Sequence, residues 1–519
     1  MHRKWWTLAA VCTGVFMLLM DLSIVNVALP SIEDAFSAGL SDIQWVVDAY
    51  ALTLAVLLLT AGSVADLVGR RLVFGTGIAV FTIASALCGA APDATFLVVS
   101  RGLQGAGGAM MFATSLALLA QEFAPEERGT AFGIFGAVTG GAVAVGPVLG
   151  GAVTTDVSWR WIFFINVPAG LALLAVTVLR LRESKPPGAR RPDIPGAVSF
   201  GSALAAFVYG LIKSQSDGWG SATVVIPLSC ALVLLVAFLV VQGRSRHPML
   251  DLSLLRIPTF TGGLVAGFAI SASIFSLTTY LTLYMQGVLG YSAIATGVRL
   301  LPFTGAIFLV APAAGRLTVK VPVKYAISGG FLLLTIAMLL MRGITAADGW
   351  THLLPGFVLA GIGCPLIAVP LSSTAVGVVE PERGGMASGI SATARQVGIA
   401  TGVAVLGTIL ATSVRDHVTD QLAATPLAPH ADRIATAAGS GSVLDATRQA
   451  PTAFRELVIS TARGSYVDAL NSVLLIGALI AAAATIVTFL MIRSEDFHHV
   501  RKAAAAGRDE TAQATSDTA

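Results

Sequence analysis

One carboxylate in the first long apolar stretch has the clearest capacity for chemistry. Asp21 lies inside the apolar residues 8–29, and about 20 such residues span a bilayer core as a helix. A carboxylate at that depth costs about 2.5–3.5 kcal/mol, so it normally faces protein or water. Burial favours the neutral form of a carboxyl group, which makes Asp21 a candidate for binding and releasing protons. The alternative is a structural carboxylate that pairs with a neighbouring helix.

A second pair of polar residues stands in the apolar stretch 96–120. Arg101 and Gln104 lie three positions apart and therefore share one face of a helix. Counting about 1.5 Å per residue from the outer ends of the two helices puts Arg101 and Asp21 at similar depth. Contact with Arg101 would favour the ionised carboxylate and oppose the effect of burial, so the arginine would tune proton release. The alternative is an arginine whose long side chain reaches the outer interface.

A short charged turn, GSVADLVGRR over 62–71, follows the second apolar stretch. Its aspartate can cap the N-terminus of a neighbouring helix or pair with an arginine such as Arg128, and its glycines let helices approach closely. Such a cluster can hold one conformation closed and break in the other. The alternative is a plain turn that obeys the positive-inside rule. We interpret it as a conformational switch that is made of Gly62, Asp66, Gly69, Arg70, Arg71 and Arg128.

A glycine-rich segment, GAVAVGPVLGG over 141–151, occupies the apolar stretch 130–153. Small residues along one helix face allow close helix packing. The proline of this segment removes a backbone hydrogen bond and bends the helix. The residues predicted to form this packing surface and its bend are Gly141, Gly146, Pro147, Gly150 and Gly151.

The composition sets the class of protein in which these residues work. The chain has 519 residues, of which 55% are hydrophobic and 12% are charged, whereas soluble domains carry about 25% charged residues. This indicates a polytopic membrane protein and argues against a soluble enzyme. The net charge of +3 is too small to indicate nucleic-acid binding. The four cysteines and seven histidines show no metal-ligand spacing, and no Walker-type loop for ATP occurs, so neither a metal nor a cofactor is expected.

About fourteen apolar stretches reach spanning length, and an even number places both termini on one side of the membrane. Most of the 32 lysines and arginines fall on the side of the N-terminus, which the positive-inside rule assigns to the cytoplasm. The predicted fold class is therefore an all-α membrane protein with cytoplasmic N and C termini. The stretches are 8–29, 44–64, 72–91, 96–120, 130–153, 161–181, 196–213, 222–242, 260–286, 294–315, 324–342, 352–377, 385–412 and 466–492.

A weak internal repeat divides these stretches into two sets. PEERGTAFG at 125–133 matches PERGGMASG at 381–389, and the turn at 62–71 has a degraded counterpart in GRLTVKVPVK at 315–324. Both matches pair stretches that are eight apart, which fits two six-helix bundles with two inserted helices, and repeated halves are typical of secondary transporters. The predicted domains are an N-terminal bundle at 1–182, a linker with the inserted helices at 183–258, a C-terminal bundle at 259–495 and a disordered cytoplasmic tail at 496–519.

One long loop, 413–465, belongs to the C-terminal bundle and is expected on the outer side of the membrane. It is rich in alanine, threonine and serine, and its charges are dispersed. We therefore expect a spacer without a function of its own. The alternative for part of it is an amphipathic helix over Thr452–Leu470 that lies at the outer surface.

Together these segments resemble fourteen-span drug:proton antiporters of the major facilitator superfamily, the QacA/EmrB-like branch, over nearly the whole chain. The resemblance implies the major facilitator fold and proton-driven export by alternating access, with Asp21 and Arg101 in proton coupling. Some relatives have a further carboxylate in the second half, whereas the stretches after 259 have none at depth, so the number of protons per cycle stays open. The resemblance is carried by MDLSIVNVALP at 20–30, GSVADLVGRR at 62–71, RGLQGAGGA at 101–109, GAVAVGPVLGG at 141–151, LYMQGVLGYSAIATGVRLLP at 283–302 and ARQVG at 394–398.

The predicted function is proton-coupled efflux of hydrophobic drugs or antibiotics across the cell membrane, by a monomer whose partners are the substrate, protons and the lipid bilayer. Asp21 favours cationic substrates unless the proton is its sole ligand. The alternative is an exporter or flippase of an endogenous lipid or secreted metabolite that uses the same antiport. Asp48 is a second candidate acid, for which a plain interfacial position is the alternative. The candidate cavity residues are Asn26, Gln104, Tyr284, Gln286, Arg395 and Gln396.

Overall fold

The computed structural model describes residues 3–36, 40–184, 193–245, 248–379, 383–439, 441, 443–448, 454–493 and 495–496. Every regular element in that part of the chain is a helix. Thirteen of the described helical segments are long and apolar enough to cross a membrane. The remaining predicted span, 130–153, lies within α5 (Pro125–Asp156), so the count of fourteen spans stays a prediction. The predicted tail falls outside the described residues, apart from Asp496.

The N-terminal half is a bundle whose helices share an apolar core. Several of its helices begin where the sequence places a start signal. Asp93 accepts a hydrogen bond from the backbone N–H of Phe96 at 2.8 Å and so caps α4, and α5 begins on Pro125, which needs no partner for an N–H there. The helices of this half are α1 (Arg3–Phe36), α2 (Leu40–Val68), α3 (Arg70–Gly89), α4 (Ala94–Glu122), α5 (Pro125–Asp156), α6 (Trp161–Phe164) and α7 (Asn166–Arg180).

The C-terminal half is built in the same way around a second core. Its first predicted span, 260–286, is one helical rod that contains two π-helical segments, η2 and η3. The helices of this half are η1 (Leu252–Arg256), α10 (Pro258–Ile270), η2 (Ser271–Phe275), α11 (Ser276–Leu283), η3 (Tyr284–Val288), α12 (Ala293–Lys320), α13 (Val323–Met341), η4 (Trp350–Leu353), α14 (Leu354–Gly377), α15 (Gly384–Leu422) and α18 (Arg455–Met491).

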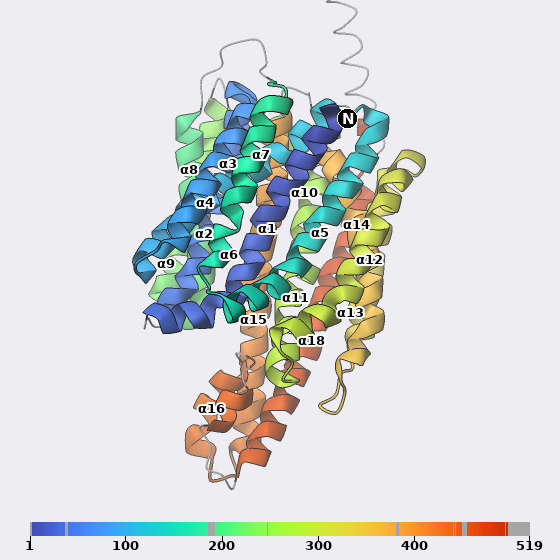
Figure 1. Ribbon diagram of the computed structural model, residues 1–519. Helices are drawn as coiled ribbons and strands as arrows, with labels where there is room; N and C mark the ends of the chain where they lie inside the picture. Colours follow the sequence, from blue (N-terminus) through green and yellow to red (C-terminus); the bar gives the residue numbers. More distant parts are fainter. Residues whose placement is uncertain are drawn as a thin grey trace, which may run out of the picture.

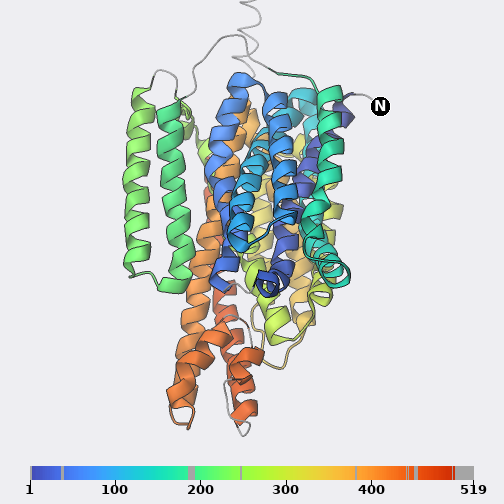
Figure 2. The same ribbon diagram turned by 60° about the vertical axis from the view of Figure 1, so that its left-hand side comes forward.

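Two helices between the halves in sequence stand beside the bundle. Figure 2 shows α8 (Ile194–Asp217) and α9 (Ala222–Arg244) as a hairpin next to α2 and α15. The side chain of Asp193 ties both ends of this hairpin. It accepts hydrogen bonds from the Gly196 N–H at 3.0 Å, from Gln242 Nε2 at 2.7 Å and from the Met249 N–H at 3.1 Å. The hairpin is thereby fixed to the segment that leads into α10.

The predicted spacer 413–465 is helical over most of its described length. α15 runs for 39 residues and α18 for 37, which is about 58 Å and about 55 Å at 1.5 Å per residue, well beyond a hydrocarbon core of about 30 Å. Val414, Val418 and Leu422 are spaced four apart and buried, so they give α15 an apolar stripe. The extension is closed by η6 (Ala428–His430), α16 (Ala431–Gly439) and α17 (Val443–Arg448).

Two expectations for this loop are therefore corrected. It is a packed helical extension of α15 and α18, which projects from one end of the bundle in Figure 1, and not a spacer. The segment Thr452–Leu470 does not form a separate surface helix, because from Arg455 onward it is the first part of α18. α1 begins and α18 ends at the opposite end of the bundle from this extension.

Candidate functional site

Asp21 lies at the centre of a buried cluster of polar side chains in the N-terminal half. Its carboxylate accepts hydrogen bonds from Arg101 Nη1, from Gln104 Nε2 at 2.9 Å and from Asn166 Nδ2 at 3.0 Å. Asp21, Arg101 and Gln104 are 0% exposed and Asn166 is 1% exposed. The contact between Asp21 and Arg101, expected from their depth in two separate helices, is thus present. Gln104, expected in the cavity, belongs to this cluster.

A serine closes the cluster on the side of α3. Ser85 Oγ accepts hydrogen bonds from Gln104 Nε2 at 3.0 Å and from Asn166 Nδ2 at 3.1 Å, and donates one to the Phe163 carbonyl at 3.1 Å. Sequence analysis missed Ser85 and Asn166. The signal that marks them is a single polar residue inside an apolar stretch, which is weak because serine and asparagine also occur in membrane helices as simple helix contacts.

Arg101 is held from two further sides. Its Nε donates to the Val46 carbonyl at 2.9 Å, and its guanidinium lies 4.2 Å from the centre of the Tyr50 ring. Tyr50 is fully buried, and its hydroxyl donates to the Leu18 carbonyl at 3.2 Å. A charge so enclosed is stabilised by its partners and by the ring face. The arginine therefore does not reach out to the interface.

The hydrogen bonds of the Asp21 carboxylate show which contacts would change if a proton bound to it. One carboxylate oxygen of Asp21 accepts from Arg101, and the other accepts from Gln104 and Asn166. A proton on the first oxygen would remove the charge that holds Arg101 and would need an acceptor of its own. Arg101 Nη2 and Asn166 Oδ1 have no hydrogen-bond partner among the described residues, so the cluster has both a donor and an acceptor available for a second arrangement.

Asp66 joins the two halves at the end of the bundle where α1 begins. Its Oδ1 accepts from Arg70 Nη2 at 3.0 Å and from the Gly385 N–H at 2.9 Å, and its Oδ2 accepts from the Met386 N–H at 2.7 Å. The carboxylate therefore caps the N-terminus of α15, where the helix dipole favours a negative charge. Both roles expected for Asp66 are present: it caps a neighbouring helix, and it pairs with an arginine, which is Arg70. Arg128, the example given for such a partner, donates to the Ala120 carbonyl at 2.7 Å.

The remaining residues of the predicted switch form the turn between α2 and α3. Gly69 has a φ of +121°, a backbone conformation that favours glycine. Glu183, which sequence analysis missed, accepts from the backbone N–H groups of Arg71 at 3.1 Å and Leu72 at 3.0 Å and so caps α3. Arg71 Nη2 donates to the Val178 carbonyl at 2.6 Å. The turn is thereby tied to the end of α7, and the hydrogen bonds of Asp66 link it to the C-terminal half.

The glycines of α5 divide into those that face a neighbouring helix and one that does not. A Cβ on Gly146 would lie 2.4 Å from the Ser23 Cβ, and one on Gly150 would lie 2.9 Å from Ile24 Cγ1, both on α1. Gly151 faces Ile294 of α12 at 3.4 Å, whereas no atom lies within 4 Å of a Cβ on Gly141. Gly141 is therefore not a packing residue. The side chain of Pro147 lies outside the described residues.

The family model described as Major Facilitator Superfamily matches residues 11–403. The chain belongs to this superfamily. Multidrug resistance protein Stp of Mycobacterium tuberculosis is 36% identical over 407 residues, which are 78% of this chain and 75% of Stp. Puromycin resistance protein pur8 of Streptomyces alboniger is 36% identical over 451 residues, 85% of this chain and 90% of pur8. The protein is thus a multi-pass transporter of the cell membrane and not an enzyme.

A solved structure shows the same superfamily fold. The human organic anion transporter MFSD10 aligns with a TM-score of 0.60 and covers 92% of this chain and 99% of its own, at 15% sequence identity. That likeness concerns the fold alone. It agrees with the arrangement of two helical halves that meet along α2 and α15 on one side and along α5 and α12 on the other.

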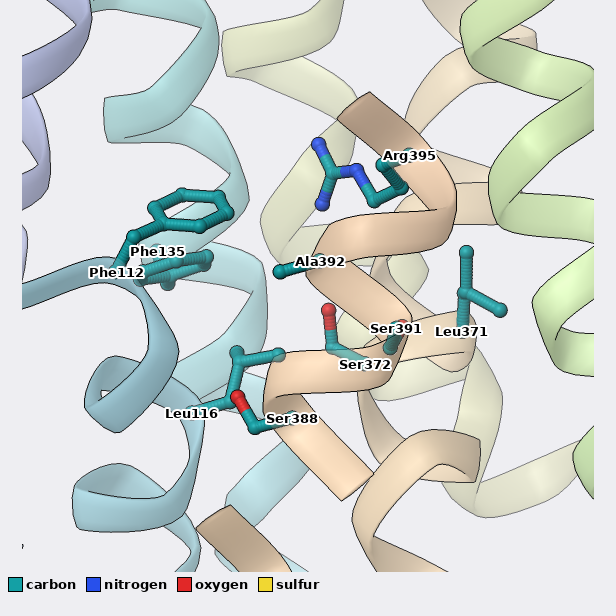
Figure 3. Close-up of a pocket in the computed structure, with 9 residues that line it drawn as sticks. All are labelled: Phe112, Leu116, Phe135, Leu371, Ser372, Ser388, Ser391, Ala392 and Arg395. Carbon is teal, nitrogen blue, oxygen red and sulfur yellow. The ribbon is translucent and has the colours of Figure 1, made fainter. Parts of the chain in front are cut away.

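As in a transporter with two halves, a pocket lies where those halves meet. α4 and α5 supply one wall and α14 and α15 supply the other, and the guanidinium of Arg395 points from α15 toward the side of Phe112 and Phe135 (Figure 3). Among the candidate cavity residues, Arg395 is the one that lines this pocket. The lining residues are Phe112, Leu116, Phe135, Leu371, Ser372, Ser388, Ser391, Ala392 and Arg395.

The other candidate cavity residues lie elsewhere. Tyr284 is buried in the C-terminal core, 6.4 Å from the Tyr466 ring, and its hydroxyl donates to the Asp348 carbonyl at 3.3 Å. Asn26 and Gln286 are exposed, and Asn26 Nδ2 donates to the Leu22 carbonyl of its own helix at 3.1 Å. Gln396 is half-buried next to the pocket-lining Arg395. Spacing along a helix shows which residues share a face, but it does not show whether that face meets the pocket or the core. These residues are not among those that line the pocket between the halves.

Asp48 lies apart from the Asp21 cluster. It faces the inserted helix α8, where it interacts electrostatically with Lys213. One turn earlier, the ring of Trp45 stacks on that of Tyr209 at 6.0 Å. Both contacts join α2 to α8, so the structure gives Asp48 a place in fastening the inserted hairpin.

Proposed function

We propose that this transporter exports hydrophobic small molecules, antibiotics among them, in exchange for protons. The names of Stp and pur8 connect these relatives with multidrug and puromycin resistance. The observation that carries the proton part is the buried cluster around Asp21. A fully buried carboxylate bonded to a fully buried arginine is costly in a membrane, and such intramembrane ionisable groups are typical of proton pathways.

In this proposal the proton acts on the ion pair that joins α1 to α4. Asp21 belongs to α1 and Arg101 to α4, so protonation of Asp21 weakens the bond between these helices. Arg101 keeps its contacts with Val46 and Tyr50 of α2. The two protonation states therefore favour different positions of α1 relative to α2 and α4. A proton that enters from outside and leaves to the cytoplasm would drive the cycle through these two positions.

Asp66 supplies the contact that opens and closes one side. We place fourteen spans in the membrane, with both termini and the turn at 62–71 in the cytoplasm, because basic residues concentrate on that side. The cap that Asp66 places on α15 then closes the cytoplasmic side and must break before substrate enters. A monomer is sufficient for this cycle, because one chain carries both halves and the pocket between them.

Transport by the purified protein in proteoliposomes tests the proton part. We expect a labelled antibiotic to accumulate against its gradient only when a pH gradient is imposed. Asp21→Asn should abolish this accumulation, because the amide cannot release a proton, while substrate binding survives. Asp34→Asn is the matched control, since Asp34 lies exposed on the same helix. Accumulation by Asp21→Asn with unchanged pH dependence would contradict the proposed role.

A further inference from the structure

Three arginines lie within spanning helices, and their surroundings differ. Arg101 bonds Asp21 and lies on the Tyr50 ring. Arg299 lies 3.8 Å from the centre of the Tyr291 ring and 5.6 Å from that of Trp350. Arg395 has neither a carboxylate nor an aromatic ring against its guanidinium, and no hydrogen bond from it is found among the described residues. An arginine inside a membrane protein that is not paired marks a substrate or ion path.

The backbone is shaped to let Arg395 enter the pocket. A Cβ on Gly267 of α10 would lie 3.2 Å from Cγ of Arg395, so this glycine leaves room for the stem of the arginine. The head group then points away from α10 and toward the N-terminal half (Figure 3). Because a guanidinium stays charged at any physiological pH, the pocket holds a permanent positive charge.

The other side chains that line the pocket are polar but uncharged, or apolar. None of the pocket-lining side chains is acidic. Ser388 lies about two helical turns from Arg395 on the same helix, is 1% exposed, and its hydroxyl has no partner among the described residues. It therefore offers a second hydrogen-bond donor in the pocket, about two helical turns away from the guanidinium. Across the pocket, Phe112 and Phe135 present two aromatic rings.

Asp21 does not act as a counter-charge for a cationic substrate. It is 0% exposed and its carboxylate is bonded to three donors, and it is not among the residues that line the pocket. The charge that a substrate meets between the halves is thus that of Arg395. This charge disfavours cationic substrates and fits the alternative in which the proton is the sole ligand of Asp21.

We propose that the pocket, widened when the two halves separate, binds organic anions that carry an aromatic ring, with a carboxylate or phenolate on Arg395 and the ring against Phe112 and Phe135. In the described conformation its volume is about 10 Å³, which is room for about one water molecule, so the ring enters only after the halves separate. Guanidinium and carboxylate match in geometry as well as in charge. The proposal rests on the proposed export function, because it makes this pocket the substrate site. Export of neutral hydrophobic molecules remains compatible with it, at lower affinity.

Equilibrium binding to the purified protein in detergent tests the proposal without requiring transport. The probes are radiolabelled naphthoate, naphthamide and naphthylmethylammonium, which share one ring system and differ in charge. We expect the wild-type protein to bind naphthoate most tightly. Arg395→Gln should weaken naphthoate binding about tenfold or more, the loss of a charged hydrogen bond, and leave naphthamide binding within about twofold. Arg395→Lys should restore part of the affinity, and Arg299→Gln should change none of the three.

Two results would overturn the proposal. One is a wild-type protein that binds naphthamide or naphthylmethylammonium as tightly as naphthoate. The other is an Arg395→Gln variant that weakens all three probes alike, as a purely structural arginine would. The same probes in proteoliposomes separate this question from proton coupling. Arg395-dependent binding without accumulation in a pH gradient would leave the anion pocket standing and remove the antiport, whereas gradient-driven accumulation without charge preference would do the reverse.

Discussion

The N-terminal and C-terminal halves meet at two helix pairs, α2 with α15 and α5 with α12. Both pairs approach through glycine backbone, but they differ in the charged groups at the contact. Where α2 meets α15, a Cβ on Gly62 would lie 2.3 Å from the Gly385 carbonyl oxygen. Where α12 meets α5, a Cβ on Gly315 would lie 2.0 Å from the Gly129 carbonyl oxygen. Gly62 and Gly315 open the two repeated turns, and Gly129 and Gly385 occupy the same place in the other repeated segment. The repeat in the sequence therefore corresponds to two equivalent close contacts.

Among the described residues, a carboxylate cap is found at the contact of α2 with α15. Asp66 is the fifth residue of its turn and caps α15, whereas the fifth residue of the counterpart is Val319, which has no acceptor group. The capped helix differs as well, since α15 begins on Gly384 and Gly385, whose backbones carry N–H groups that can donate to a cap, and α5 begins on Pro125, which has no N–H. The comparison suggests that both contacts close by backbone packing and that one of them also carries the electrostatic lock.

The largest effect on transport is expected from a substitution at a contact inside the N-terminal half, where α5 packs on α1. It shows how much is lost when two helices of the same half are forced apart. Gly146→Leu places a large side chain where even a Cβ would lie 2.4 Å from the Ser23 Cβ, so α1 and α5 must separate. We expect transport to be lost and the thermal unfolding midpoint in detergent to fall, because overpacking costs about 1–3 kcal/mol or more. A variant with wild-type transport and an unchanged midpoint would show that this pair tolerates separation.

The next effect tests whether the two contacts between the halves are equivalent. Gly62→Ala and Gly315→Ala should each reduce the initial rate of gradient-driven transport about tenfold, because each methyl group collides with a backbone oxygen. Gly305→Ala on α12 is the control, since no atom lies within 4 Å of a Cβ there. If one of the two variants transports at the wild-type rate, closure depends on a single contact and the comparison fails.

A smaller effect tests the lock itself. Asp66→Asn removes the negative charge that caps α15, an interaction worth up to about 2 kcal/mol at a helix terminus, so the end of the bundle that this cap closes should open more often. The reporter is a cysteine at Ser388, in a background without the native cysteines, labelled by an impermeant maleimide in inverted vesicles. We expect labelling about fivefold faster or more in Asp66→Asn. Val319→Asn should leave the labelling rate unchanged, and equal rates in both variants would remove the distinction between the contacts.

Much of this arrangement could be predicted from the sequence because it depends on depth and spacing. Counting residues along two spans placed Asp21 and Arg101 at similar depth, and a lone acid in a turn of glycines and arginines suggested the switch at Asp66. The count could not find Asn166 or Ser85, since one polar residue in an apolar stretch has no periodicity. It also could not decide which face of α15 meets the pocket, because small residues there face both α2 of the N-terminal half and α10 of their own half.

The helical extension at 413–465 shows a second limit of sequence reasoning. Its polar and small residues predict a spacer, although Val414, Val418 and Leu422 continue the stripe of α15. The stripe is inconspicuous because it is short and interrupted by charges. Its partners come from α16 and α18, which are distant in sequence, so the burial that stabilises it is a tertiary effect.

The smallest effect is expected at a surface ion pair beside the lock. Asp251, in the segment before α10, accepts from Arg383 just ahead of α15. Burial raises the pKa of Asp251, but hydrogen bonds from Ser253 and Arg383 outweigh it and hold that pKa below its ordinary range. A group with a lowered folded pKa contributes its stability above the unfolded value, about 3.9, and loses it only as the pH falls further.

The pair is therefore fully formed throughout the range in which a transporter works. Exposed pairs contribute about 0–1 kcal/mol, and the Asp251 side chain is 28% exposed. We expect Asp251→Asn to change the transport rate by less than about twofold and to leave its pH profile between about pH 6 and pH 8 unchanged. Asp251→Asn is measured beside Asp66→Asn in the same vesicles. If both variants lose transport equally, the lock extends to Arg383, and Asp66 holds α15 as one member of a larger charged group.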